Sequence, residues 1–199
     1  MQRLQRLLQY ASSHRAGRNI FRPSDTLLRV ATDASYLSRP KAGSVAGSFR
    51  WLGMASDPTF LNAPLSVRSA RIPVVCSSVL EAERAGAFAG GKIARDERNI
   101  LSDVGYPQPP ADIVVDNECS VGLATDAITP KHSKSIDARL HWLRDRARRG
   151  RPRARRAPGL FNIADFFTKS LPVNRHRVLA PYVASDSPSS APPSTFLQS

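Results

Sequence analysis

The sequence predicts one α/β domain, and three observations lead to that fold class. Three strand-like stretches come first, a long stretch with helical spacing follows, and a short apolar run then precedes two further helical stretches. The chain has 199 residues with 41% hydrophobic content, which is enough for one core of ordinary size. We therefore expect a sheet with helices packed against it.

The first three strands are expected between residues 27 and 75. Residues 27–31 alternate weakly between apolar and polar side chains and lead into Asp33. Residues 44–52 carry spaced apolar side chains, and residues 65–75 are rich in Val and Ile. Alternation and β-branched residues are typical of half-buried strands, so these stretches predict three successive strands.

A long helix is expected to begin after Ser78. Its apolar residues recur at spacings of three, four and seven, and Gly105 and Pro107 then stop the pattern. These apolar residues are Ala85, Phe88, Ala89, Ile93, Ile100, Leu101 and Val104. The short run Ile113 to Val115, closed by Asp116, predicts a buried central strand.

Two further helices are expected, one opened by Ser133 and a last one opened by Asn162. The first has an apolar stripe of Ile136, Leu140, Leu143 and Ala147, and the second carries Ile163, Phe166, Phe167 and Leu171. Between them lies the arginine-rich segment RRGRPRARRAPG, where Pro152 would remove a ladder hydrogen bond from any strand.

The charge of the chain favours an anionic partner such as nucleic acid. Lys and Arg number 29 against 16 Asp and Glu, which gives a formal net charge of +13.

Only Cys76 and Cys119 are present, so a disulfide scaffold or a zinc cluster is not expected. No apolar run approaches the roughly 20 residues needed to span a bilayer, so we expect no membrane association. The Ser- and Pro-rich residues 181–199 predict a disordered tail.

Four acidic residues near the expected element ends stand out in this basic chain: Asp33, Glu81, Asp116 and Asp165. Each has a structural explanation, because Ser78 to Glu81 forms a capping box, Asp165 lies in the first turn of a helix, and the other two can begin turns. Jointly, however, they can converge on one point. Mg²⁺ prefers oxygen ligands, and two metals held by carboxylates can activate water for phosphodiester hydrolysis.

Several segments together resemble the ribonuclease H domain at the end of copia-type LTR retrotransposon polyproteins. They occur in the family's order over roughly residues 25–180, and the most specific are ATDASY, SVLEAER, VDNE and IADFFTK. The resemblance implies a ribonuclease H-like α/β fold with a mixed five-stranded sheet flanked by helices. Because the arginine-rich segment stands where the family has an apolar strand, we expect the fifth strand to be degraded.

The resemblance also implies a catalytic site and its cofactor. The acids matching Asp33, Glu81, Asp116 and Asp165 would be catalytic and would bind two Mg²⁺ ions, with Mn²⁺ as a substitute, and the RNA strand of an RNA/DNA hybrid would be cut. Asp33 would bridge both metals, Glu81 and Asp116 would hold the metal near the leaving 3′ oxygen, and Asp165 would hold the metal that positions water. Glu83 competes with Glu81 for its place, although Glu81 matches the family position better.

Substrate contacts are expected outside the acidic residues. Ser35 and Asn117 are placed to read a 2′ hydroxyl, and the arginine-rich segment can follow phosphates. Its predicted nucleic-acid-binding residues are Arg148, Arg149, Arg151 and Arg153. The same segment also fits a nuclear localisation signal.

The resemblance further implies a larger context. Residues 1–24 resemble the end of a preceding reverse transcriptase region, residues 25–180 the ribonuclease H-like domain, and residues 181–199 a tail. The chain would then be part of a polyprotein, with that reverse transcriptase region as a partner. We expect a cytoplasmic or nuclear location, including virus-like particles.

Two alternatives compete with an active nuclease. Arg84 stands where the family has Tyr after its acidic motif, and Ser135 stands where it often has His, so a catalytically inactive nucleic-acid-binding remnant is the second hypothesis. The other alternative is nucleotide hydrolysis, because the run Gly86 to Lys92 matches the phosphate-binding pattern GxxxxGK. Ile93 follows it, however, where a phosphate-binding loop needs Ser or Thr. Because that run lies inside an expected helix, we interpret its glycines as permitting close packing on the sheet.

Overall fold

One mixed sheet organises the protein. The computed structural model describes residues 2–110, 112–115, 142, 145, 153–156 and 162–185. The strands are β1 (Leu27–Arg39), β2 (Gly43–Gly53), β3 (Pro64–Arg71), β4 (Asp112–Val115) and β5 (Arg153–Arg156), in the spatial order β3-β2-β1-β4-β5. The first three are antiparallel neighbours, whereas β4 pairs in parallel with β1 and β5 in parallel with β4. The α/β class and the mixed sheet predicted from the sequence are confirmed.

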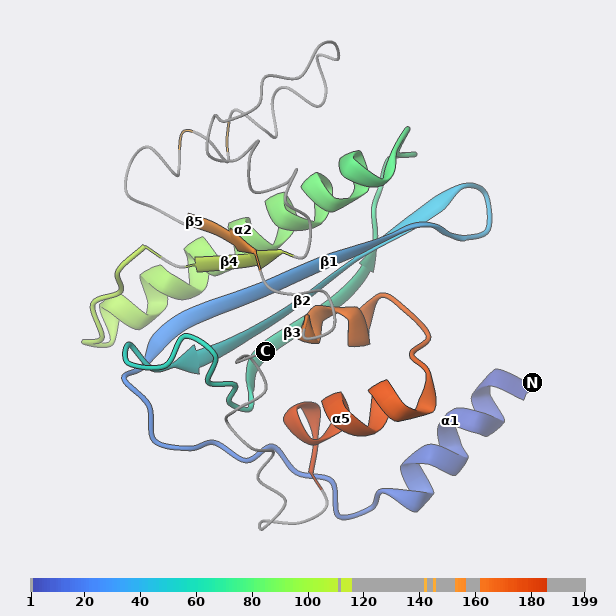
Figure 1. The fold of residues 1–199 in the computed structure, drawn as a ribbon, viewed down its shortest axis with the longest axis horizontal. Coiled ribbons are helices and arrows are strands. Elements are labelled where there is room, and N and C mark those ends of the chain that lie inside the picture. The colour runs from blue at the N-terminus through green and yellow to red at the C-terminus, as the bar shows by residue number, and fades with distance from the viewer. Residues whose placement is uncertain are drawn as a thin grey trace.

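The helices lie on opposite faces of this sheet. They are α1 (Gln2–Ser13), α2 (Val79–Asp103), the 3-10 helix η2 (Ile163–Phe167) and α5 (Val173–Val183). In Figure 1, α2 runs along one face of the sheet, while η2 and α5 lie on the other face with α1 beyond them. Alternation along the strands explains this arrangement, since Val30 packs with α2 residues and Ala31 with η2 and α5 residues. No helix among these described elements is long and apolar enough to cross a membrane.

The observed elements correct the predicted boundaries in two places. β1 is 13 residues long, so Asp33 lies in its middle opposite Gly47 and not at its end. The last predicted helix is instead the short η2, which stops before Pro172 and is followed by the separate helix α5. Pro has no backbone N–H to donate and is favoured at a helix start, which explains the break.

Other predicted elements agree closely with the structure. Ser78 caps α2, and its hydroxyl accepts from the Glu81 backbone N–H at 3.1 Å. Strand β4 spans the predicted apolar run, whereas the expected fifth strand consists only of the four residues of β5, at the edge of the sheet. The helix predicted from Ser133 lies outside the described residues apart from Trp142 and Asp145.

Residues 2–24 contact the C-terminal helix α5 and the strand-like segment after it. The rings of Tyr10 and His176 meet edge to face, with centroids 5.9 Å apart. Arg18 and Ser185 form an antiparallel bridge in which each backbone N–H donates to the other residue's carbonyl at 3.0 Å. The contact keeps these residues near the face of the sheet that carries η2.

Glycines on α2 allow the helix to approach the sheet closely. A Cβ at Gly90 would lie 2.5 Å from Thr32 Cγ2, and a Cβ at Gly86 would lie 3.2 Å from the Asp33 carbonyl oxygen. Both glycines belong to the run that matches a phosphate-binding loop, and both lie well inside α2. Their role in close packing is therefore as expected.

Gly90→Ala is expected to destabilise the protein by about 1–2 kcal/mol. Overpacking costs roughly 1–3 kcal/mol, and alanine recovers about 0.5–1 kcal/mol of helix propensity. Urea unfolding would measure the difference. Gly86→Ala is the matched control and should cost less, because its Cβ has more room. A Gly90→Ala variant as stable as the wild type would contradict the close approach.

Candidate active site

Two buried carboxylates meet on the face of the sheet that carries η2. Asp33 comes from the middle of β1 and Asp165 from η2, and they are only 4% and 1% exposed. The Lys169 ammonium lies between them, with Nζ 3.1 Å from Asp33 Oδ1 and 2.8 Å from Asp165 Oδ1. We call Asp33 and Asp165 the acid pair.

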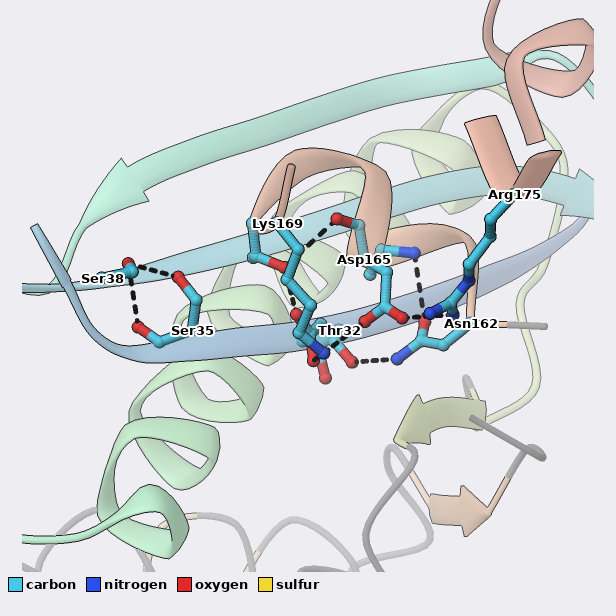
Figure 2. Close-up of polar contacts among 10 residues, drawn as sticks. Thr32, Ser35, Ser38, Asn162, Asp165, Lys169 and Arg175 are labelled. Atoms are coloured by element: carbon cyan, nitrogen blue, oxygen red, sulfur yellow. Dashed lines mark hydrogen bonds and ion pairs between the residues drawn. The ribbon is translucent and has the colours of Figure 1, made fainter. Parts of the chain in front are cut away.

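Local sequence explains why η2 carries Asp165 to β1. Asn162 caps η2, because its Oδ1 accepts from the Ala164 backbone N–H at 3.1 Å. Its Nδ2 donates to the carbonyl of Thr32 at 3.0 Å, as Figure 2 shows, which fixes η2 on the strand beside Asp33. Gly47, opposite Asp33, completes the fit, since a Cβ there would lie 2.5 Å from Thr168 Cγ2.

Three donors compensate the acid pair. The Thr168 hydroxyl donates to Asp33 Oδ2, and an Arg175 guanidinium nitrogen donates to Asp165 Oδ2. With Lys169 on the two Oδ1 atoms, all four carboxylate oxygens accept a hydrogen bond from the protein. Two carboxylates thus face two cations, which is how a buried acid pair avoids the cost of isolated charge. Figure 2 shows Lys169 and Arg175 approaching Asp165 from different directions.

Burial sets the electrostatics of Asp33. Loss of hydration raises the pKa of the Asp33 carboxyl above its ordinary value. Hydrogen bonds from Thr168 and Lys169 oppose that rise, while repulsion from Asp165 adds to it. For Lys169, burial alone would lower the pKa, but hydrogen bonding to Asp165 and the attraction of both carboxylates raise it overall.

Asp33→Asn is expected to stabilise the chain against unfolding at neutral pH when no divalent cation is present. A carboxyl with a raised folded pKa contributes stability below its unfolded pKa and loses that contribution as the pH rises through the folded value. The stability gain of the variant should therefore be small below about pH 4 and grow above it. Each kcal/mol would raise Tm by about 2–4 °C in a chain of this size.

Thermal melting in EDTA across a pH series would measure that gain. Asp96→Asn is the matched control, because Asp96 is an exposed aspartate on α2 that pairs with Arg95. Its melting temperature should differ little from that of the wild type at every pH. A stability loss in Asp33→Asn that grows with pH would mean that Asp33 is a net stabilising group.

The other predicted site residues are placed differently. Glu81 Oε2 accepts from the Ser77 backbone N–H at 2.7 Å and from the Ser77 hydroxyl at 2.8 Å, so this carboxylate closes the start of α2. The described ranges contain no group of three or more His, Cys, Asp or Glu that could hold a metal ion. Ser35 lies two residues after Asp33 on β1 and therefore on the same strand face, and its hydroxyl is 2.6 Å from the Ser38 hydroxyl. Arg84 is buried within α2.

Part of the predicted site lies outside the described residues. These positions are Asp116, Asn117, Arg148, Arg149 and Arg151, and only the backbone of Arg153 is described, in β5. In the sequence, Asp116 directly follows β4, which ends at Val115 and pairs with β1 through Val114 and Ala31.

The residues present fit a hard divalent cation in their donor chemistry. The acid pair offers four buried carboxylate oxygens of the kind that Mg²⁺ prefers. Lys169 bridges two of those oxygens, which shows that one positive charge is accommodated by both aspartates at once. A metal ion at the pair would require Lys169 to release at least one of them.

The fold is ribonuclease H-like. The structure is similar to ribonuclease H1 LC11, isolated from compost by a metagenomic approach, with a TM-score of 0.53, 16% identity, and coverage of 72% of this chain and 93% of that chain. It is also similar to the same enzyme solved in complex with an RNA/DNA hybrid, with a TM-score of 0.50, 17% identity, and coverage of 71% and 93%. No family model matches the sequence. No curated protein matches it either.

Proposed function

We propose that this chain is a Mg²⁺-dependent endonuclease that cuts the RNA strand of RNA/DNA hybrids. The observation that carries the proposal is the acid pair, in which two carboxylates from distant parts of the sequence are buried together on a ribonuclease H-like fold. Burying two like charges is costly, and such pairs are concentrated at functional sites. The strongly basic composition supports a polyanionic substrate.

Asp33 and Asp165 would hold the metal ions, together with Asp116 and Glu81 as the family resemblance implies. Two Mg²⁺ ions, or Mn²⁺ in their place, would supply an activated water and stabilise the leaving 3′ oxygen. The position of β4 supports a role for Asp116 near Asp33. Strand β4 ends at Val115, one residue before Asp116, and its Val114 pairs with Ala31, two residues before Asp33 on β1. Glu81 would first have to exchange its contacts with Ser77 for the site.

Lys169 and Arg175 are additions to the site that the resemblance did not assign. We propose that they neutralise the acid pair before substrate and metal bind, since every carboxylate oxygen has a protein donor. Arg175 donates to Asp165 Oδ2 whereas Lys169 donates to Oδ1, so Arg175 can keep that aspartate oriented while Lys169 withdraws. Lys169 is 39% exposed at its side chain and has room to swing toward a phosphate.

The partners we propose follow the same resemblance. An RNA/DNA hybrid would be bound by Ser35, Asn117 and the arginine-rich segment, and the upstream partner would be the reverse transcriptase region of a copia-type retrotransposon polyprotein. Reverse transcription would then place the protein in the cytoplasm, the nucleus or virus-like particles. In line with this substrate, the solved structure of LC11 ribonuclease H1 includes an RNA/DNA hybrid.

Cleavage of a hybrid labelled separately on each strand tests the proposal. The purified chain with Mg²⁺ or Mn²⁺ should shorten the labelled RNA and leave the labelled DNA intact, and EDTA should stop the reaction. Asp165→Asn should remove the activity, whereas Asp96→Asn should retain it. No RNA cleavage with either metal, by a folded protein, would refute the nuclease function.

A catalytically inactive nucleic-acid-binding protein is the second candidate. It is favoured by the full compensation of the acid pair, because Lys169 and Arg175 already neutralise both carboxylates. Under this hypothesis the hybrid binds with strong salt dependence, but neither Mg²⁺ nor Mn²⁺ leads to cleavage. Replacing Lys169 by Met would not restore activity either, which separates a missing ligand from a blocked site.

A further inference from the structure

We propose that a basic hollow at the β1–β2 hairpin binds the phosphodiester backbone of the nucleic-acid strand held at the acid pair. The hollow has a volume of about 440 Å³ and is open to solvent. Its lining carries three cationic side chains, Arg39, Lys41 and Arg71, and its described lining residues include no carboxylate. This inference rests on the proposed function and identifies a second contact point for its substrate.

The hollow lies on the same face of the sheet as the acid pair. One row of the sheet runs Asp33, Gly47 and Ser69, and the row two residues nearer the hairpin runs through Val45 and Arg71. Residues two apart on a strand point to the same face. The Ser69 hydroxyl, which also lines the hollow, donates to the Phe167 carbonyl at 2.6 Å, directly before the residue that contacts Asp33.

The separation of the two sites suits one nucleic-acid strand. Two residues along a strand span about 7 Å and neighbouring strands lie about 5 Å apart, so Val45 on β2 and Arg71 on β3 lie roughly 8–12 Å from Asp33. Phosphates of one strand follow each other at about 3.4 Å along the axis of a duplex. A backbone whose scissile phosphate lies at the acid pair would therefore place a phosphate one or a few nucleotides away over the hollow.

Arg71 braces the turn of the hairpin from which Lys41 projects. Arg71 lies against Gly43, where a Cβ would be 2.8 Å from its Nε, and its Nη2 donates to the carbonyls of Pro40 and Lys41 at 3.4 Å. Lys41 and Ala42 have φ values of 58° and 52°, in the left-handed region that residues other than glycine rarely adopt. A braced, unusual turn that displays a lysine beside two arginines is a preorganised phosphate contact.

Hybrid binding in EDTA, measured over a series of salt concentrations, tests the hollow without cleavage. The variant Arg39→Gln/Lys41→Asn removes two charges and leaves Arg71 to brace the turn, and Asn tolerates the left-handed φ of position 41. The slope of log K against log salt should become shallower by about 2, since each lost phosphate contact changes it by about 1. Lys41→Asn alone should change it by about 1.

The matched control removes two charges from the opposite face of the sheet. Lys92→Gln/Arg95→Gln alters side chains of α2 and should leave the slope unchanged. Circular dichroism would confirm that all variants fold. Equal slopes for the hairpin variant and the wild type, or equal losses in both double variants, would overturn the hollow as a specific contact.

The position of the contact has its own test in hybrids with one neutral methylphosphonate linkage. Neutralising a linkage one to three nucleotides from the cut should slow cleavage by the wild type and have no further effect in Arg39→Gln/Lys41→Asn. An equal slowing in both proteins would contradict the position. If the wild type cuts nothing, the nuclease function fails, yet the salt slopes in EDTA still decide whether the hollow binds nucleic acid.

Discussion

Asp33→Asn is expected to lower the rate of RNA cleavage at least about a thousandfold while the protein remains folded. Asparagine keeps the shape of the side chain and one acceptor oxygen, but it removes the negative charge that a hard cation requires. Stabilisation by a bound metal contributes several kcal/mol to such reactions, and each 1.36 kcal/mol corresponds to a factor of ten. Single-turnover cleavage of a labelled hybrid would measure the loss.

The same substitution separates a functional aspartate from a structural one. A structural aspartate would lose both stability and activity when neutralised, because its contacts hold the fold together. Asp33 should instead gain stability as it loses activity, since burial beside Asp165 makes its charge unfavourable in the folded state. Activity within tenfold of the wild type would remove Asp33 from the catalytic site, whatever happens to its stability.

Local patterns were sufficient to predict α2, β4 and the close packing of glycines on the sheet. Ser78, the apolar periodicity of α2 and the run before Asp116 each depend on neighbouring residues, so they are readable from the sequence. The length of β1 was harder to predict, because residues beyond Asp33 pair with β2 through contacts that a weak alternation does not reveal. The prediction that Asp33 and Asp165 share one site depended on the family resemblance more than on their spacing in the sequence.

The donors around the acid pair were missed for a physical reason. Lys169 lies four residues after Asp165, a spacing at which opposite charges meet on a helix, and this was the signal available in IADFFTK. Arg175 offered no such signal, because it reaches Asp165 only after the chain turns at Pro172 into α5. Tertiary contacts of this kind depend on how two elements meet, which neither element encodes alone.

Arg50 shows the same limit on the other face of the sheet. In a strand that also holds Phe49 and Trp51, an arginine is expected on the solvent side, yet Arg50 is 1% exposed beneath α2. Its Nε lies 3.1 Å from Glu97 Oε1 and 2.5 Å from the Ser66 hydroxyl, and its Nη1 lies 2.5 Å from the Ser48 hydroxyl. The protein thus buries compensated charge on both faces of one sheet.

Arg50→Met is expected to destabilise the protein by about 3–5 kcal/mol. Burial lowers the pKa of Arg50, and the attraction of Glu97 opposes that effect. Without Arg50, the Glu97 side chain, which is 16% exposed, would be left as a largely dehydrated charge, and its buried Oε2 already has no hydrogen-bond partner among the described residues. Urea unfolding would measure the loss, which is large beside the 5–15 kcal/mol typical of a domain.

The double variant Arg50→Met/Glu97→Leu should recover at least half of that loss, because it removes the uncompensated carboxylate together with its partner. Arg95→Met is the matched control on the same helix: its ion pair with Asp96 is exposed, so its removal should cost at most about 1 kcal/mol. A similar cost for Arg50→Met and Arg95→Met would show that burial adds nothing to the Arg50 pair. No recovery in the double variant would mean that Arg50 acts mainly through Ser48 and Ser66, as a hydrogen-bonding link within the sheet.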